Sequence, residues 1–254
     1  MTLEELRTEL QINGELTEIV DALKAVAISE FIKVHMPADR YSKLQPEGYY
    51  PIVSLYLDSE DLTLCKESLS GKKNRFKLRI RSYSDDEQYP TFFEIKRRIS
   101  GVIMKSRAPA RHQDVPMLLK GLMLPEQDFR TNREALNQFQ LYCSYVTAQP
   151  AVLIRYMRKA YESESENRVR ITFDRELFYK VTKEPRVTLN GSGWQTNNLT
   201  VKGVILEIKF TARYPIWLNR LVSTFNLNSR SISKFATSMQ QSSMLGYCGP
   251  WLGR

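Results

Sequence analysis

The chain has 254 residues, of which 42% are hydrophobic and 26% are charged, with a formal net charge of +9 and a pI of about 9.4. This composition excludes a disordered chain and allows one large domain or two small ones. The positive charge favours an anionic partner, which could be nucleic acid, a phosphate compound or an anionic membrane.

Several classes of site find little support in the sequence. The three cysteines, Cys65, Cys143 and Cys248, form no CxxC pair and no even set for disulfides, so we expect a reducing, cytoplasmic compartment. Two histidines, His35 and His112, are too few for a His-rich zinc site. Neither a Walker A motif nor a GxGxxG motif occurs. No signal peptide and no transmembrane run is found, so membrane association would need a partner protein.

The first part of the chain is predicted to begin with helices and to continue with strands. Two amphipathic helices are expected, over 2–12 and 15–27. Five strands are then predicted: 31–36, 49–57, 74–83, 90–99 and 101–108. Asp58-Ser59 can cap a helix over 59–70, and Ser100-Gly101 suggests a tight hairpin between the last two strands.

The second part alternates helices and strands as well. Helices are predicted over 114–121, 126–146 and 233–241, and Pro215 is expected to open another. Strands are predicted over 151–161, 169–177 and 201–210, and the last residues read as an irregular tail. Because hairpins and single helices interleave without a low-complexity linker, we expect one α+β domain dominated by an antiparallel sheet.

Residues 74–81 (NRFKLRIR) place Lys77, Arg79 and Arg81 on one face of a strand and apolar side chains on the other. For one strand alone, this is the usual pattern of a half-solvated antiparallel sheet. Five further segments repeat it, however. Their charged faces carry Glu94, Lys96 and Arg98; Lys105 and Arg107; Arg158; Arg168 and Arg170; and Glu207 and Lys209.

If such a sheet closes into a barrel with helices outside, the cations line its interior. Unpaired buried charge is costly, so this interior would need water and anions, and a polyphosphate chain would neutralise it. Arginine suits bidentate contacts to phosphate oxygens, and lysine acts as a point charge. Glu94 and Glu207 either balance charge in this cluster or bind Mg²⁺ or Mn²⁺ together with phosphate oxygens.

Eight segments in order resemble the VTC domain of the vacuolar transporter chaperone family, which belongs to the triphosphate tunnel metalloenzymes and is related to CYTH proteins. They are SLYLDS (54–59), RFKLRIRSY (75–83), FFEIKRR (92–98), VIMKSR (102–107), RYMRKAY (155–161), VRITFD (169–174), VILEIKF (204–210) and SKF (233–235). The resemblance implies an α+β fold, an antiparallel tunnel barrel with helices packed outside. It divides the chain into a helical segment (1–28), a tunnel domain (29–236) and a C-terminal helix end and tail (237–254).

The resemblance also implies the roles of individual residues. Catalytic contacts to the triphosphate are expected from Lys96, Arg79, Arg81, Arg158, Arg170 and Lys234. Further phosphate contacts are expected from Lys33, Lys77 and Lys105, and the alternation adds Arg107 and Lys209. Glu207 matches the metal-binding glutamate of the family, and Glu94 is a second candidate ligand. Lys33 aligns with a cation of the first strand, although Val34 and His35 depart from the family pattern after it.

The expected function is a polyphosphate polymerase that transfers the γ-phosphate of a nucleoside triphosphate, ATP in the first place, with Mn²⁺ or Mg²⁺. A triphosphatase and a non-catalytic polyphosphate-binding module are the alternatives. CYTH proteins begin with E-x-E-x-K, of which only Glu30 and Lys33 are present, at the wrong offset. A nucleic-acid partner is not expected, because Phe76 and Phe93 fall on the apolar face and cannot stack on bases.

Overall fold

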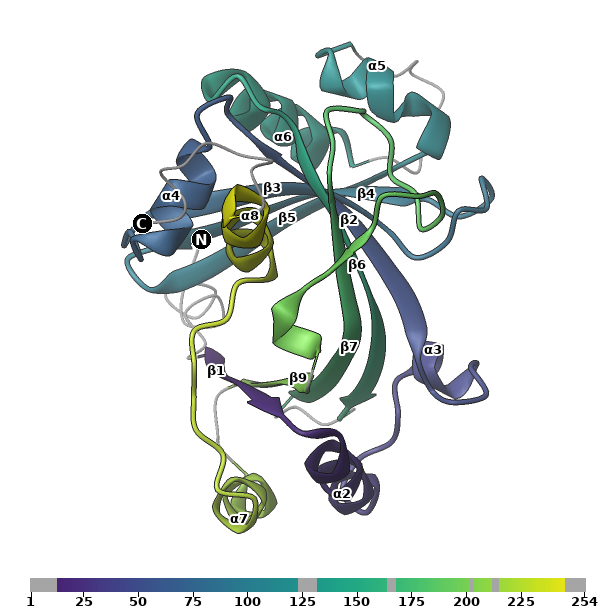
Figure 1. Cartoon of the computed structure of the whole chain (residues 1–254), viewed down its shortest axis with the longest axis vertical. Coiled ribbons are helices and arrows are strands. Elements are labelled where there is room, and N and C mark those ends of the chain that lie inside the picture. Colours follow the sequence, from purple (N-terminus) through teal and green to yellow (C-terminus); the bar gives the residue numbers. More distant parts are fainter. Residues whose placement is uncertain (1–12, 123–131, 164–167, 202, 212–214, 245–254) are drawn as a thin grey trace, which may run out of the picture. The chain divides into compact units, whose positions relative to one another are not determined.

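The computed structural model describes residues 13–122, 132–163, 168–201, 203–211 and 215–244 (Figure 1). Its strands are β1 (Asn13–Val20), β2 (Tyr50–Asp58), β3 (Arg75–Ser82), β4 (Thr91–Ile99), β5 (Val102–Ala110), β6 (Gln149–Glu162), β7 (Val169–Val181), β8 (Gln195–Thr196) and β9 (Val204–Thr211). Its helices are α2 (Ala22–Lys33), α3 (Arg40–Lys43), α4 (Thr63–Leu69), α5 (Val115–Leu119), α6 (Arg133–Tyr145), α7 (Ile216–Thr224) and α8 (Lys234–Met244). The helix expected over 2–12, the start of the one expected over 126–146 and the C-terminal tail lie outside the described residues.

The strands follow the order β1-β9-β7-β6-β2-β3-β4-β5, with β8 beside β7. The pairs β1–β9, β9–β7, β2–β3, β3–β4 and β4–β5 are all antiparallel. The predicted α+β class with an antiparallel sheet is therefore confirmed. No helix in the described part of the chain has the length and apolar character needed to cross a membrane.

The chain divides into two compact units, each made of three separate segments. Unit 1 comprises Met1–Tyr50, Tyr156–Leu177 and Asn198–Ile232. Unit 2 comprises Pro51–Arg155, Phe178–Asn197 and Ser233–Arg254. Strands β6 and β7 each contribute residues to both units, and the two units are described separately below.

In unit 2, strands β3, β4 and β5 form the meander that the alternation predicted. Ser100 (φ 49°) and Gly101 (φ 91°) form the turn between β4 and β5. Positive φ at both central residues is the geometry of a tight two-residue hairpin, which confirms the turn expected there. The turn fixes the register in which the cations of β4 and β5 meet.

Helix α6 covers the apolar face of unit 2 and contacts β3, β4 and β5 (Figure 1). Leu136 and Phe139 of α6 pack in one buried cluster with Leu78 of β3 and with Phe93 and Ile95 of β4. Phe93 and Phe139 meet edge to face, with ring centroids 5.0 Å apart. Because the apolar side chains of β3 and β4 face α6, the cations between them in sequence lie on the opposite face.

Unit 1 buries its apolar face in the same way, under α2 and α7. Ile28 and Ile32 of α2 and Leu218 and Leu221 of α7 belong to one buried cluster. The strand residues of that cluster include Val169, Ile171 and Phe173 of β7 and Leu206 and Ile208 of β9. Alternation then places Arg170, Thr172 and Asp174 of β7 and Glu207 and Lys209 of β9 on the opposite, polar face.

The helix predicted over 15–27 is wrong in its first part, because Asn13–Val20 forms strand β1 and pairs along its length with β9. The apolar residues from Leu16 to Leu23 fit a helical period, but Thr17, Ile19 and Val20 are β-branched and favour a strand. Asp21 then caps α2, since its side chain accepts a hydrogen bond from Lys24 N at 2.8 Å. Pairing with β9 therefore overrides the local helical pattern.

The strand predicted over 31–36 is also wrong, because Phe31, Ile32 and Lys33 form the last turn of α2. Ala25, Ile28 and Ile32 are buried at helical spacing, which continues the face that α2 packs on the sheet. The alternation of FIKVHM concealed this continuity, since six residues satisfy both periods.

The helix predicted over 59–70 is shorter than expected and covers Thr63–Leu69 as α4. Asp58 is fully buried and accepts hydrogen bonds at 2.8 Å from the backbone N–H groups of Leu64 and Cys65. The predicted capping role of Asp58 is therefore confirmed, although it reaches across the turn that precedes the helix.

Candidate functional site

The polar face of unit 2 carries a row of three lysines. The register pairs Lys77 of β3 with Lys96 of β4, and Lys96 with Lys105 of β5. Directly opposed side chains on one face of a sheet lie about 5 Å apart at Cβ, and like charges there are destabilising. We call these three residues the lysine row; an anion bound along it would offset their mutual repulsion.

The next row of this face contains two arginines around a carboxylate. Arg79, Glu94 and Arg107 are opposed across β3, β4 and β5. Arg79 Nε donates to Glu94 Oε2 at 2.6 Å, Arg107 Nε lies 3.4 Å from Oε1, and Arg81 Nη1 lies 3.9 Å from Oε2. Burial would raise the pKa of Glu94, but Arg79 and Arg81 outweigh it and lower the pKa to about 2. Glu94 therefore orients arginines in this structure.

Strand β2 supplies two hydroxyl groups to the same face. Tyr56 OH accepts a hydrogen bond from Arg79 Nη1 at 3.3 Å, and Ser54 Oγ accepts one from Arg81 Nε at 3.1 Å. The Tyr56 ring stacks on Phe235 of α8, with centroids 4.9 Å apart and planes 5° apart. Burial raises the pKa of Tyr56, but Arg79 and Arg81 lower it to about 8. The hydroxyl groups of Tyr56 and Ser54 thus hold the guanidinium groups of Arg79 and Arg81 in place. Neither Tyr56 nor Ser54 was predicted from the sequence as a site residue.

The start of α8 lies beside the lysine row. Ser233 Oγ accepts hydrogen bonds from Lys77 Nζ at 2.8 Å and from Ala236 N at 3.2 Å, the second as an N-cap does. Lys234 follows as the first residue of α8. Burial, together with Lys96 and the neighbouring arginines, lowers the pKa of Lys77 to about 8. The SKF segment thus lies close to Lys77, although 156 residues separate Ser233 from it in sequence.

On the polar face of unit 1, Arg158 and Lys209 are likewise paired with carboxylates. Arg158 donates to both oxygens of Asp174, Nε to Oδ1 at 2.7 Å and Nη2 to Oδ2 at 2.8 Å. Its Nη2 also lies 3.9 Å from Glu207 Oε2, and Lys209 Nζ lies 2.5 Å from Glu207 Oε1. Burial lowers the pKa of Arg158, but Asp174 more than offsets this and the pKa lies well above its usual value.

Arg170 lies at one side of a pocket in unit 1. Its guanidinium contacts Glu162 at 2.9 Å and Asp39 at 3.3 Å. The pocket has a volume of about 390 Å³, and its charged lining residues are Arg40, Lys43, Arg168, Arg170, Asp39 and Glu162. Arg170, a predicted phosphate contact, is therefore paired with the carboxylates of Asp39 and Glu162 in this structure.

Strand β1 adds a carboxylate that the sequence analysis placed on a helix. Glu15 pairs with Lys209 across β1 and β9, and its Oε1 lies 3.9 Å from Lys209 Nζ. Glu18 points to the other face, where it is 8% exposed and accepts a hydrogen bond from Asn228 N at 2.9 Å. Residues i, i+2 and i+4 of this strand are Glu15, Thr17 and Ile19, so the first strand presents one carboxylate and no cation to the polar face.

Lys33 does not lie on a strand, so the basis of its predicted role is wrong. It is in the last turn of α2, a helix that packs on the apolar face of unit 1, and its side chain pairs with Glu30 at 2.5 Å. Both side chains are exposed. The structure thus brings together Lys77, Arg79, Arg81, Lys96, Lys105 and Arg107 in unit 2, and Arg158, Glu207 and Lys209 in unit 1, and leaves Lys33 away from either polar face.

The carboxylates differ in how well they suit a divalent cation. Within residues 13–122, 132–163, 168–201, 203–211 and 215–244, no group of three or more His, Cys, Asp or Glu residues could hold a metal ion. Glu94 does not fit a metal ligand, since three arginines occupy its oxygens. Glu207 fits a metal ligand under two conditions. Phosphate oxygens must supply the remaining ligands, and they must draw Lys209 and Arg158 away from its carboxylate.

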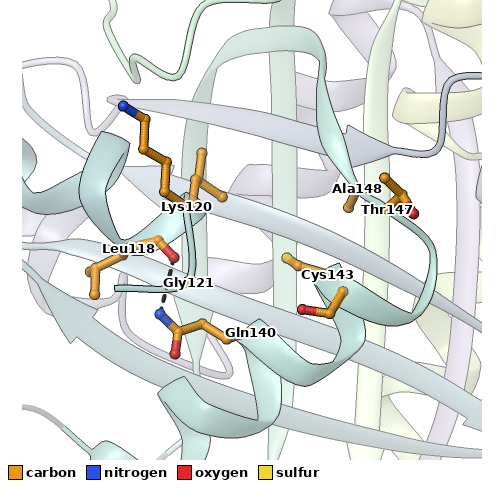
Figure 2. A pocket seen from close by; sticks show the side chains of 9 residues that line it. Leu118, Lys120, Gly121, Gln140, Cys143, Thr147 and Ala148 are labelled. Carbon is orange, nitrogen blue, oxygen red and sulfur yellow. Dashed lines mark hydrogen bonds between the residues drawn. The ribbon is translucent and has the colours of Figure 1, made fainter. Parts of the chain in front are cut away.

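A further cavity of about 210 Å³ lies in unit 2 between α5 and α6. Figure 2 shows Gln140 of α6 reaching the end of α5, where its Nε2 donates to Leu118 O at 3.0 Å. Cys143 lines this cavity, and burial raises the pKa of its thiol to about 12, so it is no nucleophile. Lys120 is the charged residue of the lining. With Lys120 as the single cation among the described residues of its lining, this cavity does not have the cation cluster of a phosphate site.

The solved structures that are similar to this chain include two that match over nearly their full length. A protein of Pyrococcus horikoshii OT3 shares 11% identity over 90% of this chain and 99% of its own, with a TM-score of 0.45. A putative adenylyl cyclase from Hippeastrum is described as having a dominant triphosphatase activity. It shares 13% sequence identity over 94% of this chain and 98% of its own, with a TM-score of 0.46. At these values nothing about activity follows for this chain. A search of curated proteins gives no match.

A family model, the VTC domain, matches residues 15–243. This match includes most of β1, which the resemblance based on short segments had left out, and it covers the other described strands and almost all of α8. The antiparallel sheet with helices that the resemblance to the triphosphate tunnel fold implied is confirmed by the strand pairing described above. The chain belongs to the VTC domain family.

Proposed function

We propose that the protein is a polyphosphate polymerase, which transfers the γ-phosphate of a nucleoside triphosphate, in the first place ATP, to a growing polyphosphate chain. The observation that carries the proposal is the lysine row, Lys77, Lys96 and Lys105, beside the arginines that Glu94 orients. Three cations opposed on one face suit a linear chain of phosphates, whose negative charges would offset their repulsion. Membership of the VTC domain family supports the same reading.

Each residue has a proposed role. In unit 2, Arg79, Arg81 and Lys96 grip the triphosphate, and Lys77, Lys105, Arg107 and Lys234 contact further phosphates. In unit 1, Arg158, Arg170 and Lys209 exchange their carboxylate partners for phosphate oxygens. Glu207 would then hold Mn²⁺ or Mg²⁺, whose contribution would be to neutralise charge on the phosphate bound at this face.

No covalent nucleophile is needed for this reaction. The terminal phosphate of the chain attacks the γ-phosphorus, the bond to the β-phosphate oxygen breaks, and the nucleoside diphosphate leaves. The protein contributes position and charge, because the transition state spreads negative charge over oxygens that the cations contact. Glu94, Tyr56 and Ser54 serve this by holding Arg79 and Arg81 in place.

The test is incubation with ATP and Mn²⁺, with and without a short polyphosphate primer, followed by a polyphosphate stain on a gel. We expect ATP-dependent polymer from the wild type and a loss of at least tenfold in Lys96→Gln. Lys120→Gln removes the same charge from the α5–α6 cavity and should leave the polymer unchanged. The absence of polymer from the wild type under all these conditions would contradict the proposal.

A triphosphatase is the second candidate, and one observation favours it. The polar face of unit 1 has more carboxylates than the sequence analysis expected, since Glu15 joins Glu207 and Asp174 there. Release of phosphate from ATP without polymer would support this candidate. Binding of polyphosphate with ATP left intact would instead support a regulatory module, and a membrane partner protein stays a prediction for either.

A further inference from the structure

Thr172 has a buried hydroxyl group without a hydrogen-bond partner. The residue is 3% exposed and lies in the middle of β7, between Arg170 and Asp174 on the polar face of unit 1. Its Oγ1 is inaccessible and makes no hydrogen bond. A buried hydroxyl usually finds a partner, and one without it lowers stability, so its presence calls for an explanation.

The charged groups around this hydroxyl satisfy one another. Thr172 is directly opposite Glu207 in the β7–β9 register, and Glu207 is held by Lys209. Next along β7, Asp174 receives both hydrogen bonds of Arg158. Thr172 is thus a short side chain next to longer charged ones that are paired with one another.

We propose that Thr172 is a ligand-contacting residue, whose hydroxyl donates a hydrogen bond to a phosphate oxygen on the polar face of unit 1. An anion that draws Lys209 away from Glu207 and Arg158 away from Asp174 separates the ion pairs beside Thr172. The hydroxyl then faces an acceptor that the ligand-free protein lacks. This inference rests on the proposed function only in so far as the face binds phosphate; it does not require polymerisation.

The experiment measures binding and stability separately. Binding of inorganic tripolyphosphate is followed by calorimetry in EDTA, where no turnover occurs, and stability is taken from the thermal midpoint of the ligand-free protein. Thr172→Val removes the hydroxyl at nearly constant shape, and Thr172→Ser keeps it. Thr91→Val is the matched control, because Thr91 is also a fully buried strand threonine but its Oγ1 donates to Ala110 O at 3.0 Å.

We expect Thr172→Val to bind tripolyphosphate about tenfold more weakly, since a hydrogen bond to a charged group is lost. Its thermal midpoint should stay the same or rise, because no bond of the free protein is removed. Thr172→Ser should bind within about twofold of the wild type. Thr91→Val should show the reverse, with a lower midpoint and unchanged affinity.

Two results would overturn the inference, and they differ from failure of the proposed function. If Thr172→Val binds as tightly as the wild type, the hydroxyl serves only a water molecule or nothing. If its midpoint falls as far as that of Thr91→Val, the hydroxyl is structural. A wild type that binds tripolyphosphate but makes no polymer contradicts only the polymerase, whereas a wild type that binds no tripolyphosphate contradicts both.

Discussion

Glu94 illustrates how the sequence can place a residue on the correct face and still leave its partner open. Alternation placed it on the cation face, where the structure finds it, 13% exposed in its side chain. A carboxylate there could bind a metal or balance charge, and sequence alone left both open. In the structure, Glu94 contacts Arg79, Arg81 and Arg107, so we interpret it as the residue that orients these arginines. Such contacts depend on strand register, which no pattern of residue types specifies.

Replacing Glu94 by Gln should change how stability depends on pH. Because the pKa of Glu94 is lowered from 4.5 to about 2, its contribution is present above pH 4.5 and is lost as the pH falls towards 2. The shift corresponds to roughly 3 kcal/mol of unfolding free energy. Urea unfolding between pH 3 and pH 7 measures it. We expect the stability of the wild type to fall more steeply towards pH 3 than that of Glu94→Gln; identical slopes would contradict this account of the residue.

At the scale of elements, the sequence predicted strands best where two signals agreed. In β3, β4 and β5, alternation coincided with a hairpin turn at Ser100-Gly101, and all three strands are found within two residues of their expected ends. At the N-terminus, β1 was hidden because its apolar residues also fit a helical period. What decides its conformation is pairing with β9, about 190 residues away in sequence, and single-sequence patterns do not contain that information. Glu15 was missed for the same reason.

Helix α4 was predicted as a helix, although with a longer range, and the contribution of its cap can be tested. Asp58 accepts backbone hydrogen bonds from Ser59, Leu64 and Cys65. Asp58→Ala should lower the unfolding free energy by about 2 kcal/mol, since it leaves buried N–H groups without a partner. Glu60→Ala, an exposed change in the same turn, should have little effect in the same urea titration. Burial is the largest influence on the carboxyl and raises its pKa from 3.8 to about 6.

Equal stability of Asp58→Ala and Glu60→Ala would show that α4 does not depend on this cap. Because the pKa of Asp58 is raised, the stability of the protein should also depend on pH through this residue. The part of the stability linked to this pKa is fully present below pH 3.8 and is lost as the pH rises through 6. The side chain of Asp58→Asn cannot ionise, so the unfolding free energy of this variant should rise relative to that of the wild type between pH 4 and pH 7.

For the whole molecule, the net charge of +9 predicted an anionic partner but could not say where it binds. Charge at a distance raises association rates and is screened within about 10 Å at 0.1 M salt, whereas contact with phosphate needs cations in fixed register. The lysine row has that register. Lys105 and Lys120 distinguish the two effects, because both are exposed and either substitution by Gln lowers the net charge by one.

We expect Lys105→Gln to weaken tripolyphosphate binding up to about fivefold at 0.1 M salt and to reduce the dependence of affinity on salt, since a phosphate contact is lost. Lys120→Gln should change neither, because Lys120 lines the cavity between α5 and α6, on the side of the sheet that α6 covers. Calorimetric titrations at several salt concentrations provide both quantities. If the two variants weaken binding equally, net charge alone attracts the anion and the lysine row has no special part in it. If only Lys105→Gln does so, register across β3, β4 and β5 is what turns a basic protein into a phosphate-binding one.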